Sequence, residues 1–136
     1  MDKHLEPAVR LRTTLLQKSY ISENETIGYG RRGHLTQGGE IGIIPIGYAD
    51  GYSRRMSCGR GWVVVRGKRC PIVGNVCMDT CMIDLSQCPE AQEGDEVILF
   101  GDKEARIEDL ARAIDTIPYE LIADLAPRVR RVYYQN

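Results

Sequence analysis

The chain has 136 residues, which is enough for one domain with a modest hydrophobic core. Hydrophobic residues make up 43% of the chain and charged residues 27%, proportions that are ordinary for a soluble globular protein. The formal net charge of −1 balances 18 basic against 19 acidic residues and argues against binding to nucleic acid or a membrane surface through bulk charge.

Most of the chain shows β-strand patterns. Residues 7–19 alternate apolar and polar side chains and predict a half-buried strand. Short runs rich in β-branched residues, bounded by turn residues, predict the other strands. These are expected at 26–31, 40–46, 62–66, 69–73, 76–85, 95–100 and 129–134. Gly67 and Lys68 separate two of the runs and predict a two-residue hairpin turn with glycine in its first position.

Two short helices are expected near the end of the chain. Residues 107–114 have apolar side chains at helical spacing, and residues 118–125 begin with a proline, which suits the first position of a helix. The strands do not alternate with helices. This pattern predicts a mainly β fold, an antiparallel barrel-like domain with two short helices, and argues against a Rossmann fold or a TIM barrel. Residues 47–61 form a long glycine-rich loop, which is typical of a functional or mobile segment.

The cysteines and the apolar runs bear on the class of protein. Five cysteines are present with no CxxC spacing and only two histidines, so no metal site is expected. Scattered, unpaired thiols suit a reducing compartment, and we expect a cytoplasmic protein. No apolar run reaches the roughly 18 residues that span a membrane, and the N-terminus is too polar for a secretory signal.

Three segments carry the most specific information. Residues 43–52 read IIPIGYADGY, an apolar strand that runs into a loop bearing two phenols and a carboxylate. Residues 28–32 read GYGRR and residues 74–79 read GNVCMD. In this order and spacing, the three segments resemble the signature segments of the C-terminal domain of bacterial alanine racemases. These are pyridoxal-phosphate enzymes of fold type III that interconvert L- and D-alanine for cell-wall peptidoglycan. The resemblance runs from about residue 7 to residue 134.

The resemblance implies a catalytic role for Tyr29. Glycines on both sides leave its phenol poorly covered, and the adjacent Arg31 and Arg32 would stabilise phenolate and lower the pKa of the phenol. In the family, the tyrosine of this segment is the base that acts on L-alanine, while the Schiff-base lysine serves the other face of the substrate. Composition alone favours a partly buried tyrosine with a hydrogen-bonded hydroxyl, and the flanking segments reverse that preference.

Five further residues receive roles through the resemblance. The main chain of Met78 would contact the substrate carboxylate, and Asp79 would line the approach. Tyr48 and Asp50 would line the channel by which substrate reaches the cofactor, and Tyr119 would lie near the cofactor phosphate. The clustering of Tyr29, Tyr48 and Met78 on one exposed surface is a further expectation.

The same residues have structural interpretations. Met78 and Asp79 fit a strand that places Cys77, Asp79 and Cys81 on one face and Met78 and Met82 on the other. The loop phenol and carboxylate at 48 and 50 would then be ordinary loop residues, and the tyrosine at the start of the second helix would pack on the core.

The resemblance also implies an organisation beyond this chain. Residues 1–136 are expected to form the C-terminal β domain of a longer polypeptide, a fragment without the N-terminal barrel that holds pyridoxal 5'-phosphate. None of the lysines lies in a segment like the family's cofactor anchor; they are Lys3, Lys18, Lys68 and Lys103. The family pairs two chains head to tail as a homodimer, and each C-terminal domain completes its partner's active site. The isolated domain is therefore expected to be inactive. A related serine racemase and a non-catalytic β-barrel interaction module are the alternatives.

Overall fold

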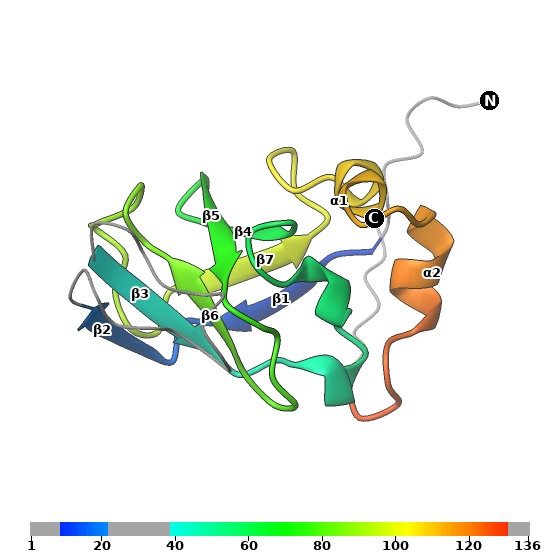
Figure 1. Ribbon diagram of the computed structural model, residues 1–136, viewed down its shortest axis with the longest axis horizontal. Helices are drawn as coiled ribbons and strands as arrows, with labels where there is room; N and C mark the ends of the chain where they lie inside the picture. The colour runs from blue at the N-terminus through cyan, green and yellow to red at the C-terminus, as the bar shows by residue number, and fades with distance from the viewer. Residues whose placement is uncertain (1–8, 22–38, 131–136) are drawn as a thin grey trace, which may run out of the picture.

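The computed structural model describes residues 9–21 and 39–130, and within them the chain forms one curved antiparallel sheet with two short helices at one end (Figure 1). Along the sheet the strands run in the order β1-β7-β4-β5-β6-β3-β2. Their bounds are β1 Leu11–Thr14, β2 Gln17–Ile21, β3 Gly39–Ile44, β4 Trp62–Val65, β5 Lys68–Val73, β6 Cys81–Asp84 and β7 Glu96–Phe100. The helices are α1, Ile107–Ala113, and α2, Pro118–Ala123, and two 3-10 turns lie between β3 and β4: η1, Tyr48–Asp50, and η2, Arg54–Met56.

The order of the strands requires the sheet to curl. β1 and β2 lie at opposite ends of the order, yet only Leu15 and Leu16 separate them in the chain. The two linking residues are bonded to both sides: the Leu15 amide donates to the Asp95 carbonyl and the Leu16 amide to the Ile43 carbonyl, each at 2.8 Å. The sheet therefore bends back on itself as a half-barrel, and the predicted mainly β, antiparallel, barrel-like fold is confirmed.

The core fills the concave interior and extends beneath α1. Buried side chains from β4, β5, β6 and β7 form a single cluster with the apolar side of this helix. Leu110 and Ile114, which the helical spacing predicted to be apolar neighbours, are fully buried there. Leu15, between the two outer strands, is also buried, so the link that curls the sheet is held by the core. None of the helices in the described ranges is long and apolar enough to cross a bilayer.

Several predicted boundaries were wrong for local physical reasons. Residues 7–19 were expected to form one strand, but the run divides at Leu15–Leu16 because the chain turns from one edge of the sheet to the other. The strand expected over 76–85 begins only at Cys81, since residues 77–80 form a turn in which the Cys77 amide donates to the Thr80 carbonyl at 3.0 Å. Met78 and Asp79 therefore do not lie on opposite faces of a strand, and that structural interpretation is wrong.

The β4–β5 hairpin differs from its prediction by one residue. Val65 pairs with Lys68, so Arg66 and Gly67 form the two-residue turn and glycine occupies the second position. Both turn residues have positive φ, 51° and 78°, the combination that type I′ hairpin turns need. The strand predicted over 26–31 lies outside the described residues. So does most of the one predicted over 129–134, whose first two residues are not in a strand.

Candidate functional site

Two loops that carry the signature segments lie against each other at the helix end of the sheet. The first is residues 47–51, which follow β3 and contain η1; the second is residues 77–80, which precede β6. We call them the η1 loop and the β6 loop. The Tyr48 amide donates to the Cys77 carbonyl and the Ala49 amide to the Met78 carbonyl, both at 2.9 Å. These bonds hold the backbones at Tyr48 and Met78 side by side, and both residues are exposed.

Two glycines of the η1 loop allow this close approach. A Cβ on Gly47 would overlap the carbonyl oxygens of Cys77 and Met78, so any other residue would separate the two loops. Gly51 has a φ of 94°, and a Cβ there would overlap the carbonyl of Asp124 in the segment after α2. Both glycines of the sequence GYADG are therefore explained by packing of backbone against backbone.

Asp50 connects the η1 loop to the segment after α2. Its Oδ2 accepts a hydrogen bond from the Gly47 amide at 3.0 Å, and its Oδ1 accepts one from Arg128 Nε at 2.6 Å. Its main-chain carbonyl accepts a bond from the Ala126 amide at 2.9 Å. The Asp50 side chain is only 16% exposed, so this carboxylate is a fixed part of the local structure.

Arg128 also reaches the β6 loop. Its Nη2 donates to Asp79 Oδ1 at 3.0 Å, so one guanidinium joins the carboxylates of Asp50 and Asp79. Hydrogen bonds to Asp50 and then to Asp79 raise the pKa of Arg128. The sequence predicted no role for Arg128, because it lies 78 residues from Asp50 and 49 from Asp79 and no local pattern signals such a contact.

The surface beside these loops carries exposed aromatic and apolar side chains. Tyr48 is 41% exposed and Met78 52% exposed. The Arg54 guanidinium lies over the Tyr48 ring, 5.5 Å from its centroid, in cation–π geometry. The rest of the 47–61 loop is anchored by Tyr52 and Met56, which are buried in the core. The loop thus has a fixed base and an exposed edge.

Tyr119 occupies the first turn of α2, immediately after Pro118. Its side chain is 74% exposed and the neighbouring Ile117 is 62% exposed, so the alternative that Tyr119 packs on the core is wrong. Tyr29 lies outside the described residues. Of the three residues expected to cluster, the structure therefore places Tyr48 and Met78 together, and the position of Tyr29 stays a prediction.

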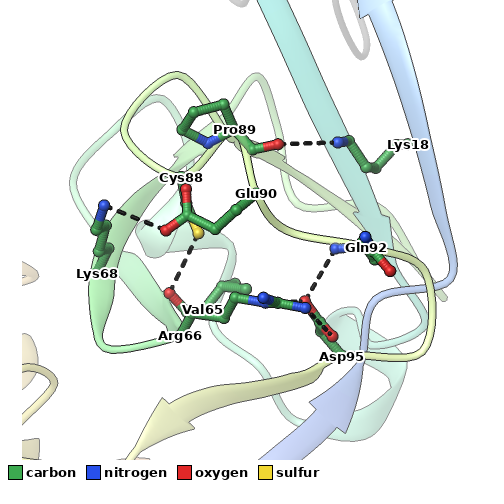
Figure 2. Close-up of polar contacts among 9 residues, drawn as sticks. All are labelled: Lys18, Val65, Arg66, Lys68, Cys88, Pro89, Glu90, Gln92 and Asp95. Carbon is green, nitrogen blue, oxygen red and sulfur yellow. Dashed lines mark hydrogen bonds and ion pairs between the residues drawn. The ribbon is translucent and has the colours of Figure 1, made fainter.

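The two loops of the candidate site contain no lysine that could hold pyridoxal phosphate covalently. Lys18 bonds to the Pro89 carbonyl at 3.3 Å and Lys68 pairs with Glu90 at 3.2 Å (Figure 2). Lys18 also pairs with Glu40 at 3.4 Å. The remaining described lysine, at 103, lies in the turn between β7 and α1. None of the three is on the η1 loop or the β6 loop. In the same described part of the chain, no group of three or more potential metal-ligating side chains occurs.

The five cysteines are all free, and three of them, Cys70, Cys81 and Cys88, are buried. Cys70 and Cys81 are buried, and burial raises the pKa of each thiol to about 12. The Cys81 thiol donates to the Ile46 carbonyl at 2.9 Å, which joins the start of β6 to the segment between β3 and η1. A neutral, buried thiol is a structural group, whereas Cys58 is exposed.

The comparisons with known proteins decide the family. Residues 8–133 match the family model described as the C-terminal domain of alanine racemase. This chain belongs to the alanine racemase C-terminal domain family. The resemblance found in the GYGRR, IIPIGYADGY and GNVCMD segments is thereby confirmed.

Alanine racemases match this chain over nearly its whole length. Alanine racemase 1 of Clostridium acetobutylicum is 39% identical over 136 residues, covering 98% of this chain and 35% of the relative. The crystal structure of the biosynthetic alanine racemase of Pseudomonas aeruginosa aligns with a TM-score of 0.90 at 37% identity, covering 96% of this chain and 36% of that one. The alanine racemase of Bartonella henselae, solved with covalently bound pyridoxal phosphate, aligns with a TM-score of 0.86 at 31% identity, covering 92% and 34%. The chain thus spans about a third of the length of these relatives.

Proposed function

We propose that this chain is the C-terminal domain of an enzyme that interconverts L- and D-alanine, an isomerase that supplies D-alanine for peptidoglycan in the cytoplasm. The observation that carries the proposal is the docking of the η1 loop on the β6 loop within a member of this family. In this arrangement Tyr48 and Met78 are exposed, and Arg128 joins the carboxylates of Asp50 and Asp79.

The proposed chemistry needs more than this chain. Inversion at an α-carbon requires a proton carrier on each face of the substrate. Tyr29 is the proposed carrier on the side that acts on L-alanine, and a lysine of another domain is the proposed carrier on the opposite side. Pyridoxal 5'-phosphate would be held by that other domain, in agreement with the ion-paired Lys18 and Lys68 of this one.

The other residues of the site have binding roles in the proposal. The Met78 main chain would contact the substrate carboxylate, with Asp79 beside the approach. Tyr48 and Asp50 would line the channel to the cofactor, and the exposed Tyr119 would lie near its phosphate. The Tyr48 and Asp50 assignment draws support from the rigid seating of the η1 loop, since a channel wall has to keep its shape.

A second subunit is the proposed partner. In a head-to-tail homodimer, the surface that carries Tyr48 and Met78 would be covered by the barrel domain of the other chain. Ile117 and Tyr119 are also exposed large side chains, and exposed apolar groups of this size commonly mark an interaction surface. No nucleic acid or membrane partner is proposed.

Chiral analysis of the full-length protein tests the function. The protein that contains this chain, purified with pyridoxal phosphate, should convert L-alanine to a mixture of both enantiomers, measured by chiral chromatography. L-serine in parallel is the comparison substrate. Faster racemisation of serine would support the serine racemase alternative, and racemisation of neither amino acid would support a non-catalytic interaction module.

A further inference from the structure

We propose that Arg128 is a positioning residue. By bridging the carboxylates of Asp50 and Asp79, it fixes the η1 loop against the β6 loop and so sets the position of Tyr48 relative to Met78. The effect on substrate rests on the proposed function, whereas the effect on the two loops rests on the contacts alone.

The guanidinium of Arg128 has the geometry for this role. Nε donates to Asp50 at 2.6 Å and Nη2 donates to Asp79 at 3.0 Å, so two different nitrogens of one planar group serve two different loops. A planar fork holds a fixed angle between its partners. A lysine ammonium, a point charge on a flexible stem, can neutralise one carboxylate but does not fix both in one plane.

The β6 loop depends on Arg128 more than the η1 loop does. The two backbone hydrogen bonds between the loops are accepted by the carbonyls of Cys77 and Met78. Asp79 follows Met78 in the chain. The Asp79 carboxylate is joined to the rest of the described structure by its bond from Arg128. The η1 side is already rigid, because Asp50 also accepts the Gly47 amide and its carbonyl accepts the Ala126 amide. Arg128 therefore connects Asp50, in the firmly held η1 loop, to Asp79, in the less restrained β6 loop.

The bridge should contribute little to the stability of the fold. The Arg128 side chain is 53% exposed and Asp79 is 63% exposed. Asp50 is only 16% exposed, but it keeps its hydrogen bond from the Gly47 amide when Arg128 is replaced. Ion pairs between exposed groups contribute little to stability, because water screens the charges and ordering two long side chains costs entropy. Loss of Arg128 should therefore leave the domain folded and move the loops, which separates positioning from a purely structural role.

Hydrogen–deuterium exchange of the protein tests the loop contacts directly. In Arg128→Gln, the amides of Tyr48 and Ala49, which bond to the β6 loop, should exchange about fivefold faster than in the wild type, the factor that an exposed ionic network can supply. Arg128→Lys should recover only part of the protection.

A matched control is available at the opposite end of the sheet. Arg66 binds Asp95 through Nε at 2.7 Å and Nη2 at 3.2 Å, with 44% and 21% of the two side chains exposed, so it is a forked arginine pair of similar exposure (Figure 2). Arg66→Gln should leave exchange at Tyr48 and Ala49 unchanged. Equal exchange in wild type and Arg128→Gln, or an equal increase in Arg66→Gln, would overturn the proposal.

Kinetics of the full-length protein test the consequence for substrate. Arg128→Gln should raise the KM for L-alanine about tenfold and leave kcat within about twofold, because the channel wall moves and the proton carriers do not. Arg66→Gln should leave KM unchanged, because the Arg66–Asp95 pair contacts neither loop. An unchanged KM in Arg128→Gln, or an equal rise in Arg66→Gln, would overturn the proposal. If the wild-type protein racemises no amino acid, the proposed function fails, while the exchange experiment still decides the role of Arg128. If Arg128→Gln does not fold, Arg128→Lys carries both measurements.

Discussion

Replacement of Gly51 by alanine should destabilise the domain much more than the same change at Gly94. The two glycines have almost the same backbone angle, φ 94° and 93°, so an added methyl group meets the same left-handed strain at both positions. They differ in their surroundings. A Cβ on Gly51 would overlap the Asp124 carbonyl and lie 2.7 Å from the Leu125 Cα, whereas a Cβ on Gly94 would meet nothing within 4 Å.

The difference between the two variants isolates the close approach of the η1 loop to the segment after α2. Backbone strain should cost about 1 kcal/mol in both variants. Overpacking against backbone should add about 1–3 kcal/mol at Gly51 alone, because the crowded atoms are main chain and have no rotamer to change. The predicted losses are therefore about 1 kcal/mol for Gly94→Ala and about 2–4 kcal/mol for Gly51→Ala.

Urea unfolding followed by tryptophan fluorescence measures these losses. Trp62 is the only tryptophan of the chain, and its indole donates to the Glu104 carbonyl at 2.8 Å, so its environment changes on unfolding. Both variants should unfold with the slope of the wild type and lower midpoints. If Gly51→Ala is no less stable than Gly94→Ala, the close approach that seats the η1 loop does not contribute as the structure implies.

Two further predictions concern the thiols and the isolated domain. Iodoacetamide at pH 8 should label the exposed Cys58 and spare Cys70 and Cys81, whose pKa of about 12 leaves almost no thiolate; comparable labelling of the three would contradict this. In the unfolded chain these thiols ionise near the ordinary cysteine pKa of 9.0, whereas in the fold they stay protonated. The free energy of unfolding should therefore fall as the pH rises from about 9 to about 12, and Cys81→Ala should lessen the fall. The isolated chain should neither form a borohydride-reducible adduct with pyridoxal phosphate nor racemise alanine; a reducible adduct at one specific lysine together with turnover would contradict this.

The fold was largely predictable because its signals are local. The β-branched runs of β4, β5 and β7 and the helical spacing of α1 are each contained in a few residues, and the structure places them close to the predicted positions. The boundaries failed where a distant partner intervenes. The β6 strand starts late because amides of the η1 loop donate hydrogen bonds to the Cys77 and Met78 carbonyls. The sequence of residues 76–85 does not indicate this contact.

The site was predictable in part for the same reason. Tyr48, Asp50, Met78 and Asp79 lie in segments with a recognisable family pattern, and the structure brings their two loops together. Arg128 was missed because its two contacts cross most of the chain and its own segment is a short basic cluster that equally suits a solvated face. The structure therefore shows what the sequence pattern does not, namely that Arg128 links the η1 loop to the β6 loop.

The most direct test of the proposed function is the exchange of the α-proton by Tyr29→Phe in the full-length protein. Phenylalanine keeps the ring for packing and removes the proton-carrying oxygen, and general acid–base groups contribute roughly 10²–10⁴-fold to rate. Incorporation of solvent deuterium into L-alanine and into D-alanine is measured separately by mass spectrometry. The rate of proton removal from L-alanine should fall by roughly 10²–10⁴-fold, and the rate of proton removal from D-alanine should change by a different factor. Equal, wild-type rates from both enantiomers would remove Tyr29 from the mechanism and contradict the proposed role of this domain.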